Sequence, residues 1–362
     1  MDHVPRIIRK ISSSVTLKIF EPSMDPTTQE ISAVALVINI FCLYGFGALA
    51  YIIPQLTGQF RRGFFCDDDS IRMSFHDNTV PASLLVVLAL LITIIAILSS
   101  EFYIVHCLER QSHRRAYRWR NASVAAFLVE STVYFGYSQV GFVAQAVLTQ
   151  IAKYSMGRLR PHFLDVCKPE GGLETICAAG LEHKYITDYK CTGIPSQIHE
   201  ARLSFFSGHS ATAVYSAVFC VLYLQCRLGG RPAPRLLLPM VQTLLMGVAL
   251  YVCFTRITDN WHHWSDVLVG AIVGTLVAVY TAVFWADLFS PARLAGYSPD
   301  DPVAISIVPP SNHRRSGENT QMTTSLSTMS SDEEARRSHS NSVGVSNAPP
   351  ILAHSEYGTT SA

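Results

Sequence analysis

The sequence is poor in charge and lacks the motifs of the common soluble enzyme classes. Only 15% of its 362 residues are charged and 49% are hydrophobic, whereas soluble domains are usually about 25% charged. The mean hydropathy is +0.25. No glycine-rich nucleotide-binding loop, zinc-type Cys/His array or long repeat occurs, and a net charge of +1 gives no indication of a nucleic-acid partner. The composition therefore predicts an integral membrane protein.

Long hydrophobic runs are abundant, and six of them could cross a bilayer, which takes roughly 20 mostly apolar residues. They are residues 31–54, 83–107, 122–152, 209–228, 236–255 and 266–286. The third contains one carboxylate, Glu130, which we expect to face the bundle interior because a carboxylate facing lipid is costly. The predicted fold class is therefore all-α, a bundle of six transmembrane helices.

Composition divides the chain into three parts. Residues 31–290 form the predicted membrane domain. Residues 1–30 are a predicted cytoplasmic arm with four Lys or Arg residues, which favours a topology-setting basic flank over a surface-lying amphipathic helix. Ser, Thr, Asn, Pro and charged residues dominate from about 297 onward, so residues 291–362 are predicted to be a disordered cytoplasmic tail.

The short loops predict the orientation. The 108–121 loop holds five arginines and one glutamate, and the 227–235 loop holds three arginines and no acid. Because Lys and Arg accumulate on the cytoplasmic side, both loops and both chain ends are predicted to be cytoplasmic. The first, third and fifth loops then lie outside the cell or in a lumen. The only glycosylation sequon, at Asn121, falls inside, so no glycan is expected there.

Four cysteines fall in the loops predicted to be external. Cys66 lies in the first loop, and the third loop holds Cys167, Cys177 and Cys191. An oxidising exterior permits them to pair. Four cysteines allow three full pairings, between which the sequence does not choose, and it leaves open whether they form two bridges, one or none.

A first polar cluster follows the third apolar run. Lys153 and Arg160 are seven residues apart, so they share a face if the helix continues, and Pro161 then ends it. Two cations on one face suit a phosphate dianion. The alternative is that each side chain only reaches the lipid headgroups.

A second polar cluster, Ser207, Gly208 and His209, leads into the fourth apolar run. The start of a helix offers free backbone N–H groups to an anion. Gly208 allows close backbone approach, and Ser207 caps the helix or binds the anion. His209 stands at the mouth of the run. An ordinary helix cap with an uninvolved histidine is the alternative.

A third polar cluster, Arg256, His262 and Asp266, separates the last two runs. His262 and Asp266 are four residues apart and are predicted to be neighbours on one helix face. A carboxylate on one ring nitrogen leaves the other free to attack, and Arg256 adds a fork for phosphoryl oxygens.

All three clusters fall on the predicted outer face. They contain no set of metal ligands, and cations with helix N–H groups can neutralise a phosphoryl group without magnesium. Together they predict a histidine-dependent phosphatase at the extracytoplasmic membrane face, with neither a metal nor another cofactor.

These residues resemble the three-part motif of the type 2 phosphatidic acid phosphatase superfamily: Lys-x6-Arg-Pro, Ser-Gly-His and Arg-x5-His-x3-Asp. The longer stretches Gly-Arg-Leu-Arg-Pro-His-Phe-Leu from Gly157, Leu-Ser-Phe-Phe-Ser-Gly-His from Leu203 and His-His-Trp-Ser-Asp from His262 are similar to the animal lipid phosphate phosphatases. The resemblance covers about residues 30–290. Thr255 stands where the superfamily usually has Ser, and Phe206 where it usually has Pro.

The resemblance implies a role for each residue. His262 is similar to the nucleophile that forms a phosphohistidine, Asp266 to its orienting partner, and His209 to the acid that protonates the leaving alcohol. The phosphate-binding residues that it implies are Lys153, Arg160, Ser207, Gly208 and Arg256.

The implied enzyme is a phosphatidate or lipid phosphate phosphatase acting in phospholipid metabolism and lipid signalling. Its implied substrates are phosphatidate, lysophosphatidate, sphingosine 1-phosphate and ceramide 1-phosphate, and the plasma membrane is the expected location. The sequence does not rank these lipids or decide whether the protein is a homo-oligomer. Two alternatives are a catalytically weak membrane scaffold or lipid-uptake protein of the same fold, and a sugar-phosphate phosphatase.

Overall fold

The computed structural model describes residues 20–21, 28–108, 116–177, 183–229 and 236–289, all within the unit Met1–Pro309. The predictions for the first 19 residues and for the tail at 291–362 lie outside the described residues.

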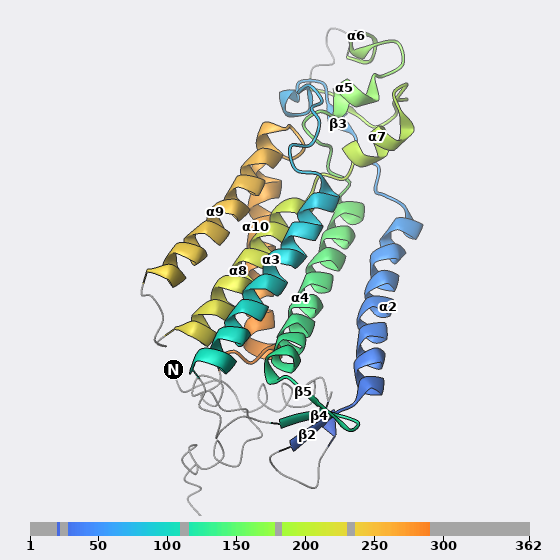
Figure 1. Cartoon of the computed structure of the whole chain (residues 1–362). Coiled ribbons are helices and arrows are strands. Elements are labelled where there is room, and N and C mark those ends of the chain that lie inside the picture. The colour runs from blue at the N-terminus through green and yellow to red at the C-terminus, as the bar shows by residue number, and fades with distance from the viewer. Residues whose placement is uncertain (1–19, 22–27, 109–115, 178–182, 230–235, 290–362) are drawn as a thin grey trace, which may run out of the picture. The chain divides into compact units, whose positions relative to one another are not determined.

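Long helices dominate the described part of the chain and lie side by side (Figure 1). They are α2 (Ala33–Thr57), α3 (Ala82–Tyr103), α4 (Ala126–Met156), α8 (Gly208–Leu228), α9 (Leu237–Thr258) and α10 (Trp264–Tyr280). Each of them overlaps one predicted apolar run. α3 and α10 continue into π-helical turns at Ile104–Leu108 and Thr281–Trp285.

Five of these helices are long and apolar enough to cross a membrane, whereas α4 is not among them. α4 packs against α2, α3, α8 and α10, and it buries several polar side chains against them, including Gln139, Gln145 and Thr149. The Gln145 amide donates to the Thr212 hydroxyl of α8 at 3.0 Å. The fold is thus mostly helical, with five candidate membrane-spanning helices and one more polar helix packed among them.

Helix α8 forms the centre of the bundle. It contacts α3, α4, α9 and α10, and twelve of its residues are buried. Gly270 and Gly274 of α10 allow a close approach, because a Cβ atom at either position would come within 2.5 Å of a backbone oxygen of Ser207 or Ala211. This contact brings the start of α8 next to the start of α10.

Two small sheets show that the all-α prediction was incomplete. β1 (Phe20–Glu21), β2 (Thr28–Ile31), β4 (Ala116–Trp119) and β5 (Ala122–Val124) form one, and β3 (Phe64–Phe65) and β6 (Tyr185–Ile186) form the other. The predicted arm at 1–30 therefore contributes strands to the first sheet, and α4 begins at Ala126 rather than 122. Beside this sheet, the half-buried Glu130 accepts a hydrogen bond from the Tyr117 hydroxyl at 2.5 Å.

The first and third loops form a cap over one end of the helices (Figure 1). It contains α5 (Phe163–Cys167), α6 (Leu173–Ile176) and α7 (Pro195–Ala201). Its core includes Phe64, Ile71 and Phe163. Disulfides join Cys66 to Cys177 and Cys167 to Cys191, which resolves the pairing that the sequence left open.

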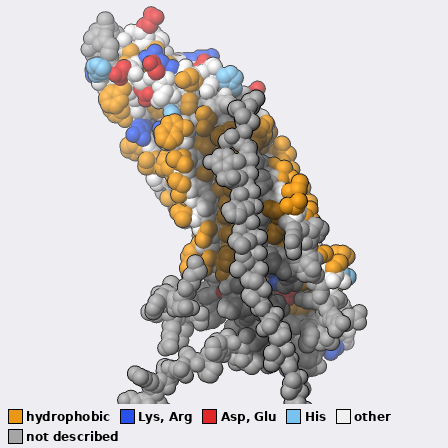
Figure 2. All heavy atoms as spheres, turned by 90° about the vertical axis from the view of Figure 1, so that its left-hand side faces the viewer, with side chains coloured by type: hydrophobic (Ala, Val, Ile, Leu, Met, Phe, Trp, Pro, Cys, Tyr) orange, Lys and Arg blue, Asp and Glu red, His pale blue; other side chains and the backbone are white. Residues whose placement is uncertain are grey.

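The apolar surface of the helices is exposed. α2 has no buried residue, and large apolar side chains such as Phe41, Leu244 and Leu276 are exposed. In Figure 2, hydrophobic side chains make up most of the helical part of the visible face that the grey residues leave open, and charged and histidine side chains gather toward the capped end. This pattern is that of a protein whose helices face lipid.

Candidate active site

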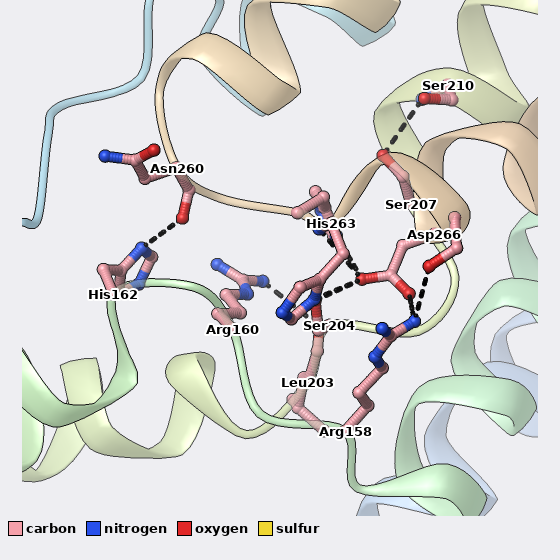
Figure 3. Close-up of polar contacts among 12 residues, drawn as sticks. Arg158, Arg160, His162, Leu203, Ser204, Ser207, Ser210, Asn260, His263 and Asp266 are labelled. Atoms are coloured by element: carbon pink, nitrogen blue, oxygen red, sulfur yellow. Dashed lines mark hydrogen bonds and ion pairs between the residues drawn. The ribbon is translucent and has the colours of Figure 1, made fainter. Parts of the chain in front are cut away.

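The three polar clusters meet where the cap joins the helices. Backbone hydrogen bonds connect them: Ser204 N–H donates to Arg158 at 3.0 Å, Arg160 N–H to Ala201 at 2.8 Å, and Ser207 N–H to Asp266 at 3.0 Å. Residues far apart in sequence thus line one buried region (Figure 3).

A sharp turn at Gly157 separates Arg160 from the end of α4. α4 ends at Met156, and Gly157 adopts a left-handed conformation with φ of 54°, which favours glycine. The condition for Lys153 and Arg160 to share one helix face, that the helix continues to Arg160, is therefore not met, because α4 ends at Met156. The turn nevertheless leaves Arg160 close enough for its charge to act on Lys153.

Arg160 has donors that remain free among the described residues. Its side chain is 2% exposed. One terminal nitrogen donates to Glu200 at 3.0 Å and to the Leu203 carbonyl at 3.3 Å. Its Nε and other terminal nitrogen are buried with no hydrogen-bond partner in the described part of the chain, so both can still donate hydrogen bonds to a bound oxyanion. Burial lowers the pKa of Arg160 to about 10, and it stays cationic at neutral pH.

His262 lies just before α10 rather than in it. α10 begins at Trp264 with His263 as its N-cap, so the prediction that His262 and Asp266 share one helix face was wrong. The His262 backbone N–H donates to the Arg256 carbonyl at 3.1 Å, and its Nδ1 lies 3.9 Å from Asp266 Oδ2. The ring is 3% exposed.

The surroundings of His262 keep it neutral. Burial, followed by the positive charges of Arg160 and Lys153, lowers its pKa well below the usual value. A neutral imidazole has a lone pair available for attack. The same cations that would attract a phosphate therefore hold the histidine in its reactive form.

Asp266 is the most completely bonded group of the site. It is 0% exposed. Its Oδ1 lies 2.5 Å from Arg158, and its Oδ2 accepts a hydrogen bond from the Ser204 hydroxyl at 2.6 Å. The His263 backbone N–H and Nδ1 lie 3.2 and 3.3 Å from Oδ2. Figure 3 shows Arg158, Ser204 and His263 around this carboxylate.

Arg256 is fully buried in the last turn of α9. It donates to Asp259 at 2.9 Å and to the Asn78 side chain at 2.7 Å. It also donates to the Thr255 hydroxyl, through Nε at 3.3 Å and Nη2 at 3.2 Å. Thr255 thus supplies the hydroxyl that the family's usual serine would bring.

The start of α8 presents His209. Ser207 is the N-cap, and its hydroxyl accepts from Ser210 N–H at 3.4 Å. A Cβ on Gly208 would lie 3.2 Å from Thr149 of α4, so this glycine also allows the two helices to pack. His209 Nε2 lies 3.1 Å from the Val80 carbonyl. Since a carbonyl only accepts, Nε2 carries the hydrogen and Nδ1 is left for proton exchange.

Sequence reasoning missed the partners of the predicted residues. They are Asn78, Arg158, Glu200, Ser204, Asp259 and His263. Arg158, Ser204 and His263 lie inside the longer stretches that resemble the family, so those stretches were the available signal. In the described part of the chain, no group of three or more His, Cys, Asp or Glu is arranged to hold a metal ion.

Comparison with known proteins identifies the family of this chain. The PAP2 superfamily matches residues 132–289. A phospholipid phosphatase homolog 1.2 homolog from Caenorhabditis elegans is 45% identical over 254 residues, which cover 70% of this chain and 74% of the relative. Phospholipid phosphatase 2 from Homo sapiens is 38% identical over 256 residues, covering 71% of this chain and 84% of the relative. A putative phosphatidate phosphatase from Drosophila melanogaster is 35% identical over 283 residues, covering 76% and 74%.

No solved structure matches the chain. The family match includes residues of all three clusters, and the similarity to the relatives extends over 254 to 283 residues. The chain therefore belongs to the PAP2 superfamily and, within it, to the animal phospholipid phosphatase family.

Proposed function

We propose that this protein hydrolyses phosphate monoesters of membrane lipids at the site around His262. Its family makes it a lipid phosphatase and an integral membrane enzyme. The observation that carries the proposal is the buried Arg160, whose unpaired donors lie near a buried neutral histidine. Buried donors normally have partners, and a phosphate would supply the missing acceptors.

Binding comes first in the proposed mechanism. The free donors of Arg160 receive two phosphoryl oxygens, and Lys153 adds a second charge. The first N–H groups of α8, at Gly208 and His209, and the Ser207 hydroxyl complete the cradle. Arg256 donates hydrogen bonds to Asp259 and Asn78, and it contributes its positive charge to the phosphate site.

Attack by His262 follows. Its Nδ1 is the ring nitrogen that the structure puts 3.9 Å from Asp266, so Nε2 forms the bond to phosphorus as the bond from phosphorus to the lipid oxygen breaks. As the substrate binds, its phosphate monoanion passes a proton to Nδ1 of His209, and His209 then gives this proton to the leaving alkoxide. Water then attacks the phosphohistidine, His209 takes its proton, and inorganic phosphate leaves.

The substrate class follows from the setting of the cradle. A groove lies between α2 and the last turns of α4, and its lining combines the apolar side chains of Ile53, Pro54, Phe60 and Ile151 with the polar side chains of Thr57, Gln59, Tyr154 and Ser155. A lipid with its phosphate at Arg160 could place its hydrocarbon chain along these side chains. This setting supports lysophosphatidate, phosphatidate, sphingosine 1-phosphate and ceramide 1-phosphate over a soluble sugar phosphate.

The proposed topology has six spans, with α4 as the most polar, and the site on the extracytoplasmic face of the plasma membrane. The membrane domain covers residues 31–290, and both flanking segments are cytoplasmic. Both disulfides lie in the cap, next to the site, which supports an oxidising compartment for that face. An epitope placed in the third loop should be reached from outside intact cells, and one placed after residue 297 should not.

Phosphate release by the purified protein tests the function. We expect release from these lipids with chelator in excess, because Lys153, Arg160 and Arg256 take the part of a metal. Strict dependence on added magnesium would contradict the mechanism. No release from any lipid, by a folded protein, would favour the scaffold or lipid-uptake alternative.

A further inference from the structure

Asp266 connects the three segments that build the site. Arg158 comes from the turn after α4, Ser204 from the segment before α8, and His263 from the start of α10, and each contacts the same carboxylate. The Asp266 backbone carbonyl also accepts from Ser207 N–H at 3.0 Å. A single buried group thus fixes how these segments lie relative to one another.

The two carboxylate oxygens have different surroundings. Oδ1 faces Arg158, whose Nη1 also donates to Ser265 at 2.9 Å. Oδ2 faces Ser204 and His263, and it is the oxygen nearest to His262. His262 Nδ1 lies 3.9 Å from Oδ2 and has no hydrogen-bond partner in the described part of the chain, so the orientation of the carboxylate decides whether this contact can close to a hydrogen bond.

A fully buried carboxylate needs compensation by charge and hydrogen bonds. In the described part of the chain, the arginine that forms an ion pair with Asp266 is Arg158. The neighbouring arginines have other partners: Arg160 pairs with Glu200 and Arg256 with Asp259. Ser204 fixes the other oxygen. Neither residue lies among the proposed phosphate ligands.

We propose that Arg158 and Ser204 are positioning residues that hold the Asp266 carboxylate so that Oδ2 orients His262. This inference rests on the proposed function, since it assigns to the two residues an effect on His262 exerted through Asp266. They do not touch the phosphate, so they affect the chemical step and not substrate binding.

A double-mutant cycle tests the proposal. Asp266→Asn, Arg158→Gln, Ser204→Ala and the two doubles with Asp266→Asn are assayed with a lipid phosphate in detergent micelles. Arg158→Gln should lower kcat on the order of ten- to a hundredfold, as loss of an outer-shell partner does, and leave KM within about threefold. In the Asp266→Asn background the same change should cost less than about twofold, because its target is already gone.

Arg158→Lys and Arg202→Gln are the matched controls. Lys keeps the charge and should restore part of kcat. Arg202 lies in the same cap, donates to the Tyr189 hydroxyl at 2.7 Å and stacks on Phe163. Arg202→Gln should lower the melting temperature and leave kcat per folded molecule unchanged.

The rate of phosphoenzyme formation with an activated aryl phosphate gives a second measurement. It should fall in Arg158→Gln and Ser204→Ala in proportion to kcat. Additive losses in the double mutants, or a rise in KM with kcat intact, would overturn the proposal. If Arg158→Gln does not fold, Ser204→Ala and Arg158→Lys carry the same cycle. An inactive wild type would instead defeat the proposed function, so the two failures are distinguishable.

Discussion

Two arginines at opposite ends of helix α8, one fully buried and one largely buried, differ in how completely they are hydrogen-bonded. α8 has 21 residues, about 30 Å of helix. Near its last turn, Arg227 donates from Nε and Nη2 to the two oxygens of buried Glu101, each at 2.7 Å. The Tyr223 hydroxyl donates to the same carboxylate, and the Arg227 guanidinium lies over the Tyr134 ring.

Arg160, near the start of α8, is more deeply buried than Arg227, but only part of its guanidinium is hydrogen-bonded. Its acidic partner, Glu200, has a side chain that is 55% exposed, and two of its nitrogens lack partners among the described residues. Its guanidinium stacks over Trp261 at 4.5 Å, which fixes its plane. A completed pair such as that of Arg227 stabilises a fold, whereas a fixed cation with free donors is ready for a ligand.

The largest effect should come from the two histidines at the Arg160 end. His262→Ala removes the nucleophile and should lower kcat by at least about 10⁴-fold with any substrate. His209→Ala should be nearly inactive on lipids. With an activated aryl phosphate, whose leaving group needs little protonation, it should still form a phosphoenzyme. Rapid quench should trap that acid-labile species in the His209 variant only. Equal trapping in both variants would contradict the assignment of His262 as the nucleophile and His209 as the proton donor.

Loss of Glu101 should affect stability and leave the chemistry intact. Glu101→Gln leaves Arg227 without its buried counter-ion, at a cost of about 3–5 kcal/mol of unfolding free energy. Thermal unfolding in detergent measures the loss. Activity per folded molecule should match the wild type because the site is a helix length away. A fall in kcat comparable to that of the site variants would mean that both ends act on catalysis.

Arg160→Gln should give the reverse result. We expect a loss of about 10²–10³-fold in kcat/KM, the usual effect of removing one anion-stabilising donor. Stability should change far less than in Glu101→Gln, because the pair with exposed Glu200 contributes little. Inorganic phosphate or vanadate should also bind more weakly. A large drop in melting temperature with kcat/KM retained would make Arg160 a structural residue like Arg227.

The smallest effect concerns the pH dependence of the cap. Burial, followed by the charge of Arg160, lowers the pKa of His162 to about 4, and its Nδ1–H donates to the Asn260 carbonyl at 2.8 Å (Figure 3). In the unfolded chain, His162 becomes protonated near pH 6.5, whereas in the folded protein it does so only near pH 4. The unfolding free energy therefore falls as pH drops from about 6.5 toward 4.

In His162→Phe this fall should be shallower. The variant should also lose about 1–2 kcal/mol at neutral pH, because the Asn260 carbonyl loses its donor. Melting temperatures at pH 7.5 and pH 5, with wild type as control, measure both effects. Equal falls in the two proteins would show that His162 does not carry the dependence.

Much of the fold was predictable because apolar runs locate helices directly. Each predicted run overlaps a long helix, and α8 begins within one residue of the prediction. The small sheets were not predicted, since strands of two to four residues such as β3 carry almost no periodic signal. The run at 122–152 was counted as a sixth span, whereas α4 is not among the five helices that are apolar enough to cross a membrane, because its polar residues pack inside the bundle.

The two helix-based arguments about the site failed for local reasons. Gly157 stops α4 before Arg160, and the His263 cap starts α10 after His262. Arg227 was counted as a loop charge that sets topology, yet it pairs with Glu101 across 126 residues of sequence.

The sequence by itself determined the membrane class, the helical segments and the residue types needed to bind and transfer a phosphoryl group. All three follow from composition and from the spacing of residues that are close together in the sequence. Only the tertiary structure decided which charges are paired. Contacts between distant segments decide that Asp266 bonds to Arg158 and Ser204 and that Glu101 pairs with Arg227. They also decide that Arg160 keeps donors without partners among the described residues. Burial then sets the strength of each contact, because a charge removed from water must find its partner in the fold or in a ligand.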